Sequence, residues 1–99
     1  MSPLAVKLYH TIQLIPKGKI ATYGALAKYL KTSPRAAASM LAANPFPDTY
    51  PCYKIVHTDG RLGGYSGRDG VPGKIRRLQA DGIEIVDGKV DLGKYGFEF

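Results

Sequence analysis

Cys52 is the only cysteine in this chain of 99 residues, and its neighbours in the sequence favour a reactive thiol. Pro47 and Pro51 stiffen the segment before it, so the cysteine lies at a rigid junction with the β-favouring run that follows. Lys54 and His57 could supply the positive potential that favours a thiolate, which is the nucleophilic form of cysteine. The alternative is a small buried apolar residue, which is the more common role of a single cysteine.

A glycine-rich segment, residues 63–70, follows the cysteine and could form the opposite wall of a cleft. Glycine has no side chain, so its backbone amide can approach a ligand closely. The chain also carries a formal net charge of +6, which favours a polyanionic partner such as nucleic acid. A basic surface without a specific partner is the alternative, because net charge alone does not define a site.

Three helices are predicted in the first half of the chain. Ser2 begins the first, whose apolar face continues to the stop at residues 16–18. Thr22 caps a second, short helix, and Ser33 opens a third that runs from Arg35 to Ala43. The last two meet across a tight turn, which is typical of a helix-turn-helix. The alanine-rich third helix is slim enough to approach DNA closely, although it could equally pack tightly against its neighbours.

The second half predicts short strands and one more helix. Residues 53–62 are expected to form a small hairpin with its turn at Asp59–Gly60. A final helix begins at Pro72 and ends at Gly82, and residues 83–92 form another hairpin. The fold class is therefore α+β, with a helix-turn-helix (winged-helix-like) core and a short β-hairpin.

The sequence predicts a single domain over residues 1–99, because no linker, repeat or low-complexity tract interrupts the apolar residues. No apolar run is long enough to span a bilayer, and the start lacks the build of a signal peptide, so we expect a soluble, intracellular protein without a membrane partner. The spacing of His10, His57 and Cys52 supports neither a metal site nor a cysteine hydrolase, so we expect no metal.

Seven short motifs follow one another along the chain. They are Ile15-Pro16-Lys17-Gly18, Thr22-Tyr23-Gly24, Ser33-Pro34-Arg35-Ala36, Asn44-Pro45, Pro51-Cys52, Ile55-Val56 and Gly63-Gly64-Tyr65-Ser66-Gly67. Together they resemble the active-site domain of the O6-alkylguanine-DNA alkyltransferases, and the tail around residues 90–95 is similar to that of the short alkyltransferase-like proteins. The resemblance implies a protein that acts as a monomer in the cytoplasm or nucleus, binds double-stranded DNA containing alkylated guanine, and moves the alkyl group irreversibly to Cys52 without a cofactor.

The resemblance also implies a role for each site residue once the damaged base has been flipped out of the helix. The implied catalytic residues are Cys52, Tyr53, Asp81 and Asn44. The residues implied to contact DNA through its minor groove are Arg35 as an intercalating finger, Tyr23 against a phosphate, Ala36, Thr22, Ser33 and Lys54. The residues implied to form the lesion pocket are Ile55, Tyr65, Ser66, Leu41 and Gly64. Ordinary structural roles are the alternatives for several of them: a solvated arginine, a core tyrosine, a turn serine and a helix-capping asparagine.

Three positions depart from the family pattern. Tyr53 and Lys54 replace the family's His and Arg, and Asp81 replaces the Glu that completes its proton relay. A phenol, with an ordinary pKa near 10, accepts a proton at neutral pH only if its pKa is strongly lowered. Three hypotheses follow: a slower or differently activated alkyltransferase, a lesion sensor that flips the base without reacting, and a plain winged-helix DNA binder with an inert thiol. Relatives of the sensor type usually carry Trp in place of the cysteine, so Cys52 favours the first hypothesis.

Overall fold

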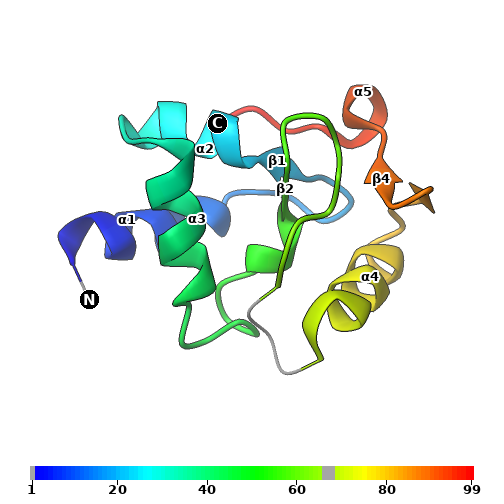
Figure 1. Cartoon of the computed structure of the whole chain (residues 1–99), viewed down its shortest axis with the longest axis horizontal. Helices are drawn as coiled ribbons and strands as arrows, with labels where there is room; N and C mark the ends of the chain where they lie inside the picture. The colour runs from blue at the N-terminus through cyan, green and yellow to red at the C-terminus, as the bar shows by residue number, and fades with distance from the viewer. Residues whose placement is uncertain (1, 66–68) are drawn as a thin grey trace.

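The computed structural model describes residues 2–65 and 69–99. Its elements, in chain order, are α1 (Pro3–Ile12), β1 (Ala21–Thr22), α2 (Tyr23–Leu30), α3 (Pro34–Ala42), the 3₁₀ turn η1 (Cys52–Lys54), β2 (Ile55–Val56), α4 (Gly70–Ala80), β3 (Ile85–Val86), β4 (Lys89–Val90) and α5 (Leu92–Tyr95). Figure 1 shows α1, α2 and α3 gathered on one side, with β1 and β2 between them and α4. This α+β arrangement is the predicted fold class.

The first three helices begin where the sequence predicts. The hydroxyls of Ser2, Thr22 and Ser33 each accept a hydrogen bond from the N–H three residues later, at 3.1, 3.0 and 3.0 Å. Each hydroxyl satisfies one of the amide groups that a helix start leaves without a partner. The first helix ends at Ile12 and is therefore shorter than its apolar pattern predicted. Ile15 is nevertheless buried, because the turn that follows the helix directs it into the core.

The second and third helices form the predicted helix-turn-helix. Lys31 ends α2 in the left-handed region, with φ at 58°, and reverses the chain direction. α3 then packs against both α2 and α1. Ala37 is fully buried in this contact, while Arg35 stays exposed on the opposite side of the helix. The small alanine side chains of α3 thus serve tight packing, and they leave one face of the helix uncovered.

The prediction of a hairpin over residues 53–62 is wrong. The two-residue strand β2 pairs instead with β1 in parallel, with Ala21 opposite Ile55, and both residues of β2 are fully buried. Burial on both faces is the usual environment of a parallel strand, so this apolar pair does not need a hairpin partner. Beyond it, Arg61 forms an antiparallel bridge with Lys89 and so joins the turn to the second hairpin.

The second hairpin, β3–β4, is confirmed within residues 83–92. Asp87 and Gly88 both have positive φ angles, 54° and 73°, as a tight type I′ turn requires. α4 begins at Gly70, two residues before the predicted start. Within residues 2–65 and 69–99, no helix combines the length and apolar character that crossing a bilayer requires.

Two buried clusters meet at the strand pair. The first joins α1, α2 and α3 to Cys52 and Ile55. The second lies between α4, the strands and the C-terminal hairpin, and consists of Ile20, Val56, Leu62, Leu78, Ile83, Val90 and Tyr95. Because Ile55 and Val56 face opposite clusters, β2 holds η1 and its cysteine at the boundary between them.

Candidate active site

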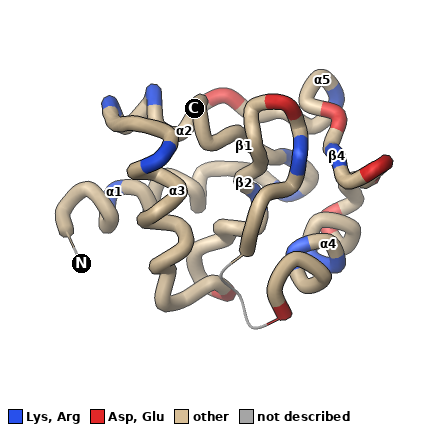
Figure 2. Tube along the Cα trace, in the orientation of Figure 1, with Lys and Arg blue, Asp and Glu red and all other residues tan. Residues whose placement is uncertain are grey.

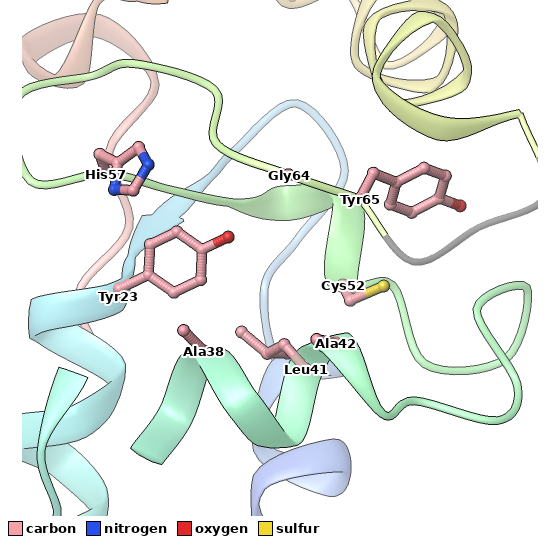
Figure 3. Close-up of a pocket in the computed structure, with 8 residues that line it drawn as sticks. All are labelled: Tyr23, Ala38, Leu41, Ala42, Cys52, His57, Gly64 and Tyr65. Atoms are coloured by element: carbon pink, nitrogen blue, oxygen red, sulfur yellow. The ribbon is translucent and has the colours of Figure 1, made fainter. Parts of the chain in front are cut away.

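A pocket of about 350 Å³ lies between α3 and the segment that runs from residue 57 to residue 65. Its lining residues are Tyr23, Ala38, Leu41, Ala42, Cys52, His57, Gly64 and Tyr65. Figure 3 shows Cys52 and Tyr65 toward one end of this pocket and Tyr23 and His57 toward the other. The helix-turn-helix therefore forms one wall of the pocket, and the cysteine lies in the wall at one end.

The backbone before Cys52 holds its side chain in place. Pro51, at φ −77° and ψ 66°, makes an inverse γ-turn in which the Cys52 N–H donates to the carbonyl of Tyr50 at 2.7 Å. The cysteine is 6% exposed, so its sulfur lies in the pocket wall with little contact with solvent. A proline in this turn restricts the backbone further, because its ring fixes φ.

Asn44 braces the loop that leads to this turn. Its side chain is buried, donates from Nδ2 to the Tyr50 carbonyl at 2.9 Å, and accepts at Oδ1 from the Phe46 N–H at 2.9 Å. Both bonds connect the end of α3 to the segment just before Cys52. The position of Asn44 agrees with a bracing role and differs from a simple helix cap, because its partners lie in the following loop.

Lys74 is the residue that sequence reasoning missed. Its side chain is fully buried, and Nζ donates to the carbonyls of Ile55 at 2.7 Å, Gly64 at 3.1 Å and Leu62. These three carbonyls belong to β2 and to the segment that carries Gly64 into the pocket wall. Lys74 therefore ties the strand after the cysteine to the opposite wall of the pocket.

Burial lowers the pKa of Lys74 to about 8, because its ammonium is removed from water. A negative charge on Cys52 acts in the opposite direction and raises the pKa of Lys74, so the two groups are close enough to feel each other's charge. The sequence held one signal of this arrangement. Lys74 lies four residues before Leu78, on the face of α4 that turns inward, where a lysine is rare unless its ammonium has partners.

Tyr53 and Asp81 contact each other, but not in the way a proton relay needs. The Tyr53 hydroxyl donates to Asp81 Oδ2 at 2.9 Å. Burial and then this hydrogen bond to a carboxylate raise the pKa of Tyr53 well above its usual value of 10.0. Tyr53 does not meet the condition under which a phenol could accept the proton of the thiol, because its pKa is raised and it keeps its own proton at neutral pH.

Lys54 does not lie on the surface that the sequence reasoning assigned to DNA. It is 7% exposed, its Nζ donates to the Ile15 carbonyl at 3.1 Å, and the same atom lies 3.8 Å from Asp81 Oδ2. The predicted contact of Lys54 with DNA does not fit this placement, because its ammonium is occupied inside the protein. It connects η1 to the end of the turn after α1.

The remaining residues expected to contact DNA gather at the starts of α2 and α3. Ser33 and Arg35 are exposed, while Tyr23, Thr22 and Ala36 are half-buried. Residues 1–47 hold six Lys and Arg and no Asp or Glu, so the whole net charge of +6 resides in this half of the chain. Figure 2 shows basic positions at α2 and the turn that follows it. This half of the chain contains the helix-turn-helix, so its surface suits a polyanion.

The residues that we expect to form a lesion pocket divide into three groups. Leu41, Gly64 and Tyr65 line the pocket that also contains Cys52. Ile55 is fully buried behind it, with its carbonyl occupied by Lys74, so it supports the wall without lining it. Ser66 lies outside the described residues. The Tyr65 hydroxyl is a buried polar atom for which the described residues provide no hydrogen-bond partner.

A helix-turn-helix is typical of DNA-binding domains, and here it adjoins a pocket with a cysteine in its wall. Residues 3–83 match the family described as the DNA-binding domain of 6-O-methylguanine DNA methyltransferase, and the chain belongs to this family. The sequence resemblance is thereby confirmed.

Known relatives support the same family. A bifunctional methyltransferase/endonuclease from Picrophilus torridus is 47% identical over 92 residues, covering 91% of this chain and 30% of that protein. A DNA base-flipping protein from Thermus thermophilus is 42% identical over 71 residues, covering 72% of this chain and 48% of that protein. The chain thus spans less than half the length of either relative. The crystal structure of S. pombe Atl1 in complex with damaged DNA containing O6-carboxymethylguanine shares the fold, with a TM-score of 0.88, 23% identity and coverage of 100% of this chain and 98% of that one.

Proposed function

We propose that this protein repairs O6-alkylguanine in DNA by irreversible transfer of the alkyl group to Cys52, after the damaged nucleotide has been flipped into the pocket. The observation that carries the proposal is the position of Cys52 in the wall of a pocket of about 350 Å³. A base inside the duplex cannot reach such a sulfur, so it must leave the stack first. Membership of the 6-O-methylguanine DNA methyltransferase family supports this substrate class, and a DNA substrate supports a location in the cytoplasm or nucleus.

The transfer is a single displacement at the alkyl carbon. The Cys52 thiolate attacks this carbon from the side opposite O6, a sulfur–carbon bond forms and the carbon–oxygen bond breaks. The bonding electron pair passes to the guanine, which takes a proton from water, and the proton of the original thiol leaves to solvent. The thioether that results has no easy leaving group, so each protein molecule reacts once.

Lys74 supplies the positive potential that this thiolate needs. The raised pKa of Tyr53 removes the phenol as a base, and Lys54 is occupied by Ile15 and Asp81. The buried ammonium of Lys74 has no carboxylate among its hydrogen-bond partners in the described residues, so its charge remains available to stabilise a nearby anion. We therefore assign thiolate stabilisation to Lys74 in place of the family's relay.

The helix-turn-helix opens the duplex in this proposal. Arg35, exposed near the start of α3, fills the gap that the flipped base leaves, and Tyr23 presses on the neighbouring phosphate. Ala36, Thr22 and Ser33 border the same surface and allow close approach to the minor groove, where readout is largely insensitive to sequence. Tyr65 and Gly64 then form the wall against which the extruded base lies.

Intact-protein mass spectrometry tests the proposal directly. After incubation with duplex DNA containing O6-methylguanine, we expect the protein to gain the mass of one CH₂ group, because a methyl replaces the thiol hydrogen. The Cys52→Ser variant should gain nothing, and unmodified duplex should leave both proteins unchanged. Lesion binding without any adduct over a broad range of pH would reject the transfer reaction.

We expect Tyr53→Phe to change the rate of methyl transfer by no more than about twofold, because a phenol that keeps its proton does not serve as the base. Single-turnover reactions that are quenched at successive times and analysed by intact-protein mass spectrometry would measure this rate. The variant loses one hydrogen bond to Asp81, which costs roughly 1 kcal/mol of stability, so urea unfolding should accompany the assay. A loss of activity of a hundredfold or so with intact folding would restore Tyr53 to the reaction.

A lesion sensor that flips the base without reacting is the second candidate. Two observations favour it. The Tyr53 hydroxyl donates to Asp81 and its pKa is raised, so this pair is poorly suited to take a proton from the thiol. A relative 42% identical over 71 residues bears the name DNA base-flipping protein. The mass experiment separates the two candidates, because a sensor retains the lesion in DNA and its own unmodified mass. A winged-helix binder with an inert thiol would show no preference for lesion DNA over plain duplex.

A further inference from the structure

His57 and Tyr23 form an aromatic pair at the end of the pocket away from Cys52. Their ring centroids are 5.2 Å apart, and the rings are tilted by 48°. His57 is exposed and Tyr23 is half-buried, so the pair lies at the mouth of the pocket. In Figure 3 the Tyr23 hydroxyl points into the pocket and the imidazole lies beside the same ring.

Gly63 shows that the polar atoms of this pair converge. It has a φ of +70°, and a Cβ added there would lie 3.0 Å from His57 Nε2 and 3.2 Å from the Tyr23 hydroxyl. Both polar atoms therefore lie against the same point of the backbone. A side chain at position 63 would push them apart, so the glycine allows an imidazole nitrogen and a phenol to be presented together.

The charges around the pair suit an anion from outside the protein. No carboxylate is among the residues that line the pocket within the described chain. Asp59, on the same turn as His57, is engaged by Arg61 through a 2.7 Å ion pair. The other titratable lining groups are Tyr23, Cys52 and Tyr65, and burial raises the pKa of both tyrosines above 10.0, so both phenols remain neutral hydrogen-bond donors near pH 7.

We infer that His57 is a second donor, beside Tyr23, to the backbone phosphate next to the flipped nucleotide. The inference rests on the proposed flipping reaction, because a base lying toward Cys52 keeps its sugar and phosphate at the opposite end of the pocket. An imidazole N–H and a phenol O–H are both donors, and the phosphate supplies the acceptors and the negative charge.

The test compares the chain's two histidines in a Cys52→Ser background, which keeps binding reversible. His57→Gln should weaken binding to O6-methylguanine duplex roughly fivefold, because the imidazole contact with the phosphate is lost. His10→Gln is the matched control, since His10 is exposed on α1 and interacts with Gln13 and Tyr50, away from the pocket. Fluorescence anisotropy would give the dissociation constants, and thermal unfolding would check each fold.

Two further arms separate a phosphate contact from a structural role. A neutral methylphosphonate on one side of the lesion nucleotide should abolish the effect of His57→Gln, because the charge that the imidazole meets is gone. His57→Lys should restore binding, because its ammonium also donates to a phosphate. If His57→Gln lowers affinity equally on the neutral and the charged backbone, or does not lower it at all, the inference is overturned while lesion binding itself stands. If the parent protein does not bind lesion DNA, the proposed function is overturned instead.

Discussion

Lys74→Met is expected to slow methyl transfer to Cys52 by about 10- to 100-fold at neutral pH, because it removes the buried positive charge that stabilises the thiolate. Single-turnover transfer and the rate of Cys52 alkylation by iodoacetamide in the absence of DNA would both report this change. The second measurement does not depend on DNA binding, so it isolates the thiol.

Lys54→Met is the matched control for this prediction. Lys54 is also buried, but its ammonium pairs with Asp81 and the Ile15 carbonyl. We expect Lys54→Met to lower stability and leave the rate of transfer to Cys52 within about twofold of the parent's, because it removes a charge that is already paired. An equal slowing of transfer in both variants would contradict a specific role for Lys74.

The stability of the protein provides an independent readout of the buried lysine. The pKa of Lys74 is about 8 in the folded chain and 10.5 when it is exposed, so the unfolded state binds more protons between these values. The free energy of unfolding should therefore rise with pH across this window, by at most about 3 kcal/mol. Urea unfolding of the parent should show this rise and Lys74→Met should not. Above pH 10 the raised pKa of Tyr53 acts in the opposite direction and lowers stability as the pH increases.

Arg35→Ala should reduce methyl transfer from duplex DNA by about 30-fold, which corresponds to about 2 kcal/mol, because the gap left by the flipped base is no longer filled. The fold should be unaffected, since Arg35 is exposed and a positive charge near a helix start opposes the helix dipole. The salt dependence of binding to plain duplex should also weaken by roughly one phosphate contact. Single-turnover transfer on lesion duplexes measures the first effect.

Single-stranded DNA distinguishes an intercalating finger from an ordinary charge contact. On a single strand carrying O6-methylguanine there is no stacked partner to replace, so the defect of Arg35→Ala should largely disappear. Arg76→Ala is the matched control, because Arg76 is also exposed but lies on α4 and pairs with Asp69 at 3.0 Å. An equal defect on single-stranded and duplex substrates would argue that Arg35 contributes only charge.

Local signals were enough to predict the elements that surround the site. Hydroxyl caps at Ser2, Thr22 and Ser33, together with the turn at residues 87–88, specify their helices and hairpin through neighbours only a few residues away. The helix-turn-helix and the position of Cys52 after a stiff loop follow from such short-range chemistry. Residues that depend on a neighbour along the chain can be recognised from residue type and spacing.

Long-range packing produced the features that residue type and spacing did not reveal. β2 pairs with Ala21, more than thirty residues earlier in the chain, and its burial on both faces replaces the expected hairpin. The same packing directs Lys54 inward to Ile15 and places Lys74 among three carbonyls beside the cysteine. A lysine in a sequence gives no sign of which distant carbonyls will accept hydrogen bonds from its ammonium, because burial and partners are properties of the assembled chain. The family and the thiol could thus be recognised from the residues themselves, whereas the source of positive charge near that thiol depended on how helix α4 packs against the strand.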